Sequence, residues 1–112
     1  MPIIRYTTPT IQFKFSTVSV TDITVAYLVI KQGGRAVIER DLTTATIVHT
    51  TNGQNVVTEN YLQWKLTQEE TKKLSKNLDA TIYCDWKLSD GTRGLSHVKQ
   101  DTVDDCGKEE VL

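Results

Sequence analysis

Apolar and polar side chains alternate along most of this chain, and turn residues interrupt the alternation about every ten positions. The clearest stretches are residues 10–16 and 78–88. Their apolar positions are Ile11, Phe13, Phe15, Ala80, Ile82, Cys84, Trp86 and Leu88. A period of two is that of a half-buried β-strand, because successive side chains point to opposite faces of a sheet. Valine, isoleucine and threonine supply 36 of the 112 residues, and β-branched side chains suit a pleated surface. The sequence therefore predicts a mostly β protein.

Short turn signals divide the chain into hairpins. Residues 23–32 are apolar on both faces, which predicts a central strand or one whose outer face a partner covers. Gly33-Gly34 follows, and because glycine accepts positive φ, residues 35–40 should fold back antiparallel on that strand. Asn52-Gly53 and Asp90-Gly91 predict two further turns.

The remaining segments complete the pattern. Strands are expected across residues 44–50, 56–66 and 92–103, the last with Gly94, Ser96 and Val98 small enough to lie beside Trp86. Between two of these strands the period changes. Thr67 and Glu70 have the spacing of a capping box, which predicts one short helix over residues 67–75. So short a helix is marginal alone, and it should depend on the burial of Leu66, Leu74 or both.

About seven strands in a chain of this length predict an all-β fold, a single immunoglobulin-like antiparallel β-sandwich. The Cys, Trp, Cys order of antibody domains is missing, so the likeness is one of architecture. Residues 1–104 should form the sandwich, with a radius of gyration of about 13 Å, and residues 105–112 an acidic, flexible tail. The expected structural core contains Phe13, Phe15, Leu62, Trp64, Ile82 and Trp86.

No group of residues predicts a reaction. The only histidines and cysteines are His49, His97, Cys84 and Cys106, and their spacing fits no metal motif. Ser96 and His97 are adjacent, so a strand would place them on opposite faces and prevent a catalytic pair. We therefore expect no catalytic, cofactor-binding or metal-binding residues and no cofactor. Cys84 should be a reduced thiol in the core, whereas the sequence leaves the state of Cys106 open.

Charge and hydropathy give no sign of nucleic acid or membrane binding. Thirteen basic side chains balance fourteen acidic ones, which is not the basic footprint of a nucleic-acid-binding protein. The longest apolar run, residues 25–30, is far shorter than the roughly 20 residues of a membrane-spanning helix. No export signal is visible, so the protein should be made in the cytoplasm.

Three tyrosines are the candidate interface residues. Tyr27, Tyr61 and Tyr83 lie opposite or offset from the main apolar face of their strands, where aromatic side chains often serve interfaces. Cross-strand pairing on the sheet surface is the alternative for each of them. If all three line one outer sheet, they would form a subunit contact.

Several short motifs carry a family resemblance. They are Thr8-Pro9-Thr10, Asp22-Ile23-Thr24, Lys31-Gln32-Gly33-Gly34, Leu66-Thr67-Gln68-Glu69-Glu70-Thr71, and Ser89-Asp90-Gly91 followed by Ser96. Across residues 8–103 the chain resembles small proteins encoded in phages and prophages of Gram-positive gut bacteria. A weaker likeness is to the amino-terminal immunoglobulin-like domain of upper baseplate proteins. The chain departs from this pattern in residues 52–60 and in the tail.

The resemblance implies a non-enzymatic virion protein of the tail, baseplate or another position, located in the virion after synthesis in the host cytoplasm. Its partners would be other virion proteins, itself as a homo-oligomer, or both. One alternative is a carbohydrate-binding sandwich in which Trp64, Trp86 and the tyrosines stack on sugar rings. A second alternative is a small host-directed inhibitor.

Overall fold

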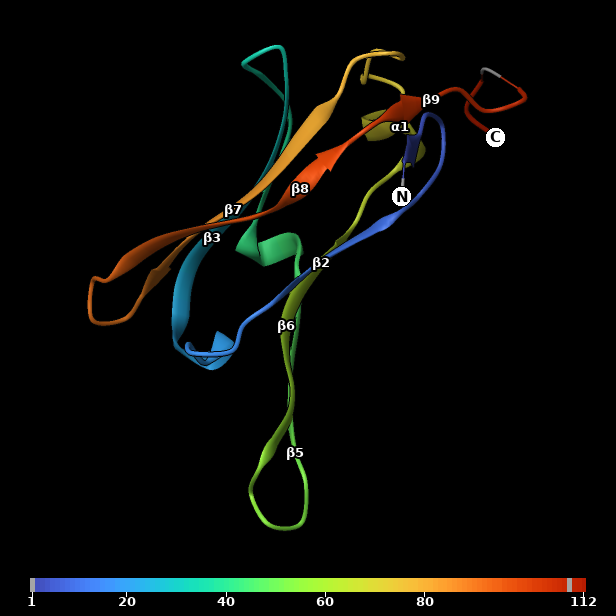
Figure 1. Ribbon diagram of the computed structural model, residues 1–112. Helices are drawn as coiled ribbons and strands as arrows, with labels where there is room; N and C mark the ends of the chain where they lie inside the picture. The colour runs from blue at the N-terminus through green and yellow to red at the C-terminus, as the bar shows by residue number, and fades with distance from the viewer. Residues whose placement is uncertain (1, 109) are drawn as a thin grey trace.

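Strands predominate in the computed structural model, which describes residues 2–108 and 110–112 (Figure 1). The expected mostly β fold is confirmed. Nine strands occur in the described residues: β1 (Ile3–Ile4), β2 (Thr10–Lys14), β3 (Ile23–Gln32), β4 (Arg35–Asp41), β5 (Thr46–Thr51), β6 (Val57–Lys65), β7 (Ala80–Leu88), β8 (Arg93–Asp101) and β9 (Val103–Asp104). Three short helical turns accompany them: η1 (Val20–Asp22), η2 (Leu42–Thr44) and α1 (Gln68–Thr71).

The strands form two antiparallel sheets and one small parallel pair. The order is β2-β6-β5 in the three-stranded sheet and β4-β3-β7-β8 in the four-stranded sheet. β1 pairs in parallel with β9, which joins the two ends of the chain. β3 lies between β4 and β7, so the expectation of a central strand for residues 23–32 is confirmed.

The β3–β4 hairpin forms as the sequence predicts. Gly33 and Gly34 have φ angles of 59° and 76°, the left-handed values that glycine tolerates best. The register shifts between Ile30 and Lys31, close to the hairpin turn, and leaves Val37 of β4 as the extra residue of a bulge. The bulge increases the local twist of the two strands.

The β5–β6 turn differs from the expected two-residue turn. Asn52 begins a longer loop, in which its side-chain oxygen accepts hydrogen bonds from the backbone N–H groups of Gln54 (2.8 Å) and Val56 (3.1 Å). Asn55, not Gly53, takes the left-handed conformation, with φ at 61°. An asparagine side chain that bonds its own backbone competes with the tight Asn-Gly turn, which explains the difference.

The helix is shorter than predicted. Only Gln68–Thr71 is α-helical, although the capping box of Thr67 and Glu70 is present with both of its hydrogen bonds. Leu66 and Leu74 are both buried and attach the segment to the core. The capping residues set where the helix begins, and a single turn has too few hydrogen bonds to be stable without the burial of Leu66 and Leu74.

One hydrophobic core takes side chains from both antiparallel sheets. Phe13, Leu62, Trp64 and Ile82 are buried in it, whereas Phe15 and Trp86 are partly buried and pack against it. Phe13 meets Trp64 edge to face, and Phe15 meets Trp86 in the same way, each with ring centroids 5.9 Å apart. These edge-to-face pairs are the preferred arrangement of aromatic rings.

The β7–β8 hairpin places Gly94 under the Trp86 indole, as expected. A β-carbon at Gly94 would overlap the ring, so any other residue there would force the indole or the backbone to shift. Trp86 Nε1 donates a hydrogen bond of 3.3 Å to Ser96 Oγ. The expectation for Val98 lies outside the described side chains.

The molecule is more elongated than its length predicts. Its radius of gyration is 15.3 Å, against about 13 Å for a compact domain of this size, and its long axis measures 48 Å. Figure 1 shows the reason, since the β5–β6 hairpin, in green, extends away from the other strands. We call residues 46–60 the hairpin arm. Both chain ends lie at the opposite end of the molecule, beside the β1–β9 pair.

Candidate functional site

The outer side of the four-stranded sheet exposes a group of apolar side chains. We call Val25, Tyr27, Val29, Tyr83 and Leu95 the exposed sheet face. Tyr27 stands opposite Asp85, which stands opposite Leu95, and in the next row Val29 stands opposite Tyr83. The exposed fractions are 39% for Val25, 48% for Tyr27 and 62% for Leu95. This face exists because residues 23–32 are apolar on both sides, whereas most half-buried strands carry polar groups outward.

Charged groups lie among these apolar side chains. Arg93 donates hydrogen bonds to both carboxylate oxygens of Asp85, and this pairing lowers the pKa of Asp85 below its ordinary value. The Lys31 ammonium lies 5.5 Å from the centre of the Tyr83 ring, within the range of a cation–π contact. Of these groups, tyrosine and arginine are enriched at protein interfaces, whereas lysine and aspartate are depleted there.

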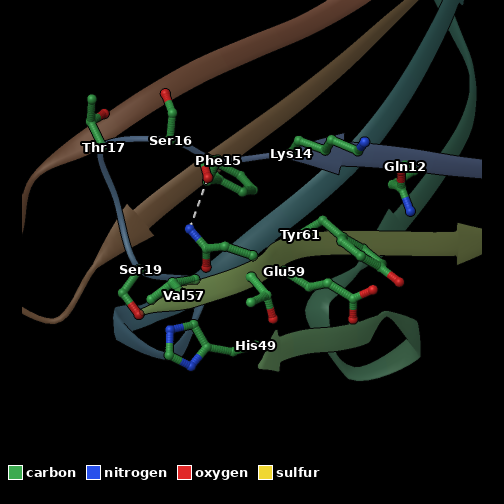
Figure 2. A pocket seen from close by; sticks show the side chains of 12 residues that line it. Gln12, Lys14, Phe15, Ser16, Thr17, Ser19, His49, Val57, Glu59 and Tyr61 are labelled. Carbon is green, nitrogen blue, oxygen red and sulfur yellow. Dashed lines mark hydrogen bonds between the residues drawn. The ribbon is translucent and has the colours of Figure 1, made fainter. Parts of the chain in front are cut away.

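A polar cleft of about 690 Å³ lies at the base of the hairpin arm (Figure 2). β2 pairs with β6 only as far as Lys14, which stands opposite Tyr61. The part of β6 from Val57 to Asn60 therefore has no strand on its β2 side, and the cleft lies there. Figure 2 shows His49 on one side of the cleft near Ser19 and Val57, and Ser16 and Thr17 at the opposite rim. Tyr61 and Glu59 line its outer part.

Asn60 holds the wall of this cleft in place. Its amide nitrogen donates hydrogen bonds to the carbonyl oxygens of Phe15 (2.9 Å) and Val18 (2.7 Å), the first of which is the dashed line in Figure 2. Its amide oxygen accepts a hydrogen bond of 3.0 Å from the backbone N–H of Val20. One side chain thus links β6 to three backbone groups of the segment from Phe15 to Val20.

The cleft does not assemble the groups that a nucleophilic or metal-dependent reaction needs. His49 pairs with Asn60 across the β5–β6 ladder, so these two side chains lie on the same face of the sheet. Glu59 precedes Asn60 in β6 and therefore points to the opposite face. Ser19 Oγ instead shares a hydrogen bond of 2.8 Å with Thr21 Oγ1. Within residues 2–108 and 110–112, no group of three or more His, Cys, Asp or Glu side chains could hold a metal ion. The side chain of His97 lies outside the described part.

The two cysteines occupy different surroundings. Cys84 is buried in the core, and this burial raises the pKa of its thiol to about 12. Cys106 lies near the carboxyl end, partly exposed, and both thiols are free. Cys84 is therefore a packing residue, consistent with its place on the apolar face of a strand.

The structure separates the three candidate tyrosines. Tyr27 and Tyr83 lie together on the exposed sheet face, whereas Tyr61 is in β6 of the other sheet and lines the polar cleft. The three tyrosines therefore do not line one outer sheet, which was the condition for a single subunit contact. The sequence analysis missed Val25 and Leu95 as members of this face, although the apolar run of residues 23–32 already contained the signal for Val25.

Comparisons with protein families, with curated proteins and with solved structures found no match to this chain. No helix among the described residues is long and apolar enough to cross a membrane.

Proposed function

We propose that this chain is a non-enzymatic structural protein of a phage virion, in the tail, baseplate or another position, that acts through protein–protein contacts. The observation that carries the proposal is the exposed sheet face. Val25, Tyr27 and Leu95 are exposed on the same side of this sheet, and exposed apolar groups that lie together often mark interaction sites. Docking on a larger virion protein would bury them, with Tyr27 and Tyr83 as the anchors.

The proposal includes an immunoglobulin-like sandwich as the fold. The strand orders β2-β6-β5 and β4-β3-β7-β8 support it, because the chain crosses from one sheet to the other after β2, after β4 and after β6. The antiparallel sheets share one core, as in a sandwich. The parallel β1–β9 pair then closes one end of the molecule.

Carbohydrate binding is the second candidate, and one feature favours it. The polar cleft joins the Tyr61 ring to the hydroxyl groups of Ser16, Thr17 and Ser19, groups that could bind a sugar. The tryptophans support it less. Trp64 is completely buried and donates a 2.8 Å hydrogen bond to the Asp41 carbonyl, and Trp86 covers Gly94.

Incorporation of variants into virions tests the proposed function. Particles would be produced with the wild-type chain or with Tyr27→Ser, Tyr83→Ser or Tyr61→Ser, and the chain in purified particles would be measured by mass spectrometry. We expect the Tyr27 and Tyr83 variants to reduce incorporation by about tenfold, since each removes an aromatic anchor.

Tyr61→Ser is the matched control, because it makes the same change on the other sheet. It should leave incorporation unchanged. Equal incorporation of all four chains would contradict a role for the exposed sheet face. Loss of binding to a glycan array with Tyr61→Ser alone would instead support the carbohydrate-binding candidate.

A further inference from the structure

The outer edge of the hairpin arm has an unusual composition. β5 pairs with β6 on one side and is the last strand of its sheet, so alternate residues direct their N–H and C=O groups away from the sheet. Among the described residues, no backbone hydrogen bond links Thr46–Thr51 to any segment other than β6. The strand therefore presents a ladder of donors and acceptors that a further strand could satisfy.

β5 lacks the features that protect the other sheet edges. Proteins prevent pairing of edge strands with charged side chains, proline or bulges. β4 carries Arg35, Glu39, Arg40 and Asp41, and β8 and β2 also contain charged residues. β5 reads Thr-Ile-Val-His-Thr-Thr, with no acidic residue, lysine, arginine or proline. Its only irregularity is the register shift between Thr50 and Thr51, which affects one end.

We propose that β5 pairs antiparallel with β5 of a second copy of this chain, a contact that rests on the proposed structural function and identifies one of its partners. The pair would join two three-stranded sheets into a continuous sheet, related by a two-fold axis. Such an interface uses the same surface on both subunits. Strand addition of this kind derives its affinity from backbone hydrogen bonds, and its specificity from the side chains that alternate along the strand.

The geometry selects one register. A two-fold axis perpendicular to the sheet keeps each side chain on its own face, so opposed residues must point to the same face. Because side chains alternate along the strand, a residue of odd number cannot oppose one of even number. Residues 46–50 form the regular part of β5, ahead of the register shift, and their centre is Val48. Thr46 of one copy then lies opposite Thr50 of the other, and Ile47 lies opposite His49.

These pairs are self-complementary. Two β-branched valines meet at the centre, threonines face each other on both sides, and no like charges oppose, all of which favour cross-strand pairing. Ile47 is 46% exposed although it stands opposite the fully buried Leu62 on the same face. A second copy would cover it. β5 has no acidic residue, lysine or arginine, so two copies of it can pair without repulsion between like charges. β8 contains charged residues and is less suited to such pairing.

Charge placed across the Thr46–Thr50 pair tests both the contact and its register. Both threonines are exposed, so substitution leaves the fold intact, which far-ultraviolet circular dichroism would verify. Thr46→Lys with Thr50→Lys puts like charges opposite each other twice in the dimer. Thr46→Glu with Thr50→Lys puts opposite charges there and differs by one side chain. Gln12→Lys, on the far edge of the same sheet, is the control for added charge.

Sedimentation equilibrium of the full chain, from about 10 μM to about 1 mM, gives the dimer dissociation constant. We expect the wild type and Gln12→Lys to dimerise alike. The double-lysine variant should raise the dissociation constant about tenfold or more, and the glutamate–lysine variant should restore it. A wild type that is monomeric throughout, or two double variants with equal constants, would overturn the proposal. The virion-incorporation experiment tests the exposed sheet face and does not depend on the β5 contact. A monomeric wild type would therefore overturn the β5 contact alone, and unchanged incorporation would contradict the role of the exposed sheet face alone.

Discussion

At the scale of single residues, burial sets the chemistry of the two thiols. Removal from water disfavours the thiolate of Cys84, which raises its pKa to about 12 from 9.0. At pH 8 this thiol is protonated as well as enclosed, so it should resist alkylation in the native protein. Cys106 is partly exposed and should react first. Iodoacetamide labelling of Cys106→Ser, followed by mass spectrometry, should show no modification until urea unfolds the chain; rapid labelling of the native variant would contradict the core position of Cys84.

The same raised pKa predicts how stability changes with pH. The unfolded chain loses the Cys84 proton near pH 9, whereas the folded chain keeps it until about pH 12. Above pH 9 the unfolded state binds fewer protons, so the free energy of unfolding should fall as pH rises. Urea denaturation at pH 8 and pH 10.5 measures this fall. Cys84→Val should show a smaller fall, and identical pH dependence in the two chains would rule out Cys84 as its source.

Gly94 is the residue whose replacement has the clearest steric consequence. Gly94→Ala would push a methyl group into the Trp86 ring, and overpacking of this kind costs about 1–3 kcal/mol. Gly53→Ala is the matched control, because nothing lies within 4 Å of its added carbon. The free energies of unfolding of both variants in urea provide the test. A Gly94→Ala variant as stable as Gly53→Ala would show that the indole can move aside without cost.

At the scale of elements, strands were more predictable than the connections between them. Alternation over β2 and β7 predicted which side chains face the core, because a period of two is a property of neighbouring residues alone. The β5–β6 loop and the end of α1 were not predictable in the same way. They depend on the Asn52 side chain bonding its own loop and on where Leu74 meets the core. The strands β1 and β9 have two residues each, too few for a period, and their pairing joins distant parts of the chain.

Asn60 gives the strongest prediction for a connection. Its three hydrogen bonds satisfy backbone groups of Phe15, Val18 and Val20, and Asn60→Ala would leave all three without this partner. We expect a loss of about 1–3 kcal/mol in the free energy of unfolding. We also expect faster amide hydrogen exchange at Val20. Gln63→Ala, on the outward side of the same strand, is the control; equal effects of the two substitutions would contradict the bracing role of Asn60.

At the scale of the whole molecule, the chain combines a flat exposed sheet face, a projecting hairpin arm and joined termini. The tyrosines remain a prediction as interface residues, and the structure places two of them, Tyr27 and Tyr83, on one side of the four-stranded sheet. The sequence could not predict that Tyr61 would lie elsewhere, because the assignment of strands to sheets is set by long-range pairing. Nor could it predict the elongated shape, since the length of a hairpin beyond its sheet depends on where the neighbouring strand ends.

The central claim is that this protein is built into a virion. Particles purified by density gradient and analysed by quantitative mass spectrometry test it most directly. We predict that the chain follows the particle band at a fixed ratio to the major virion proteins. A chain abundant in the producing cells but missing from the particle band would contradict the claim and favour a host-directed inhibitor.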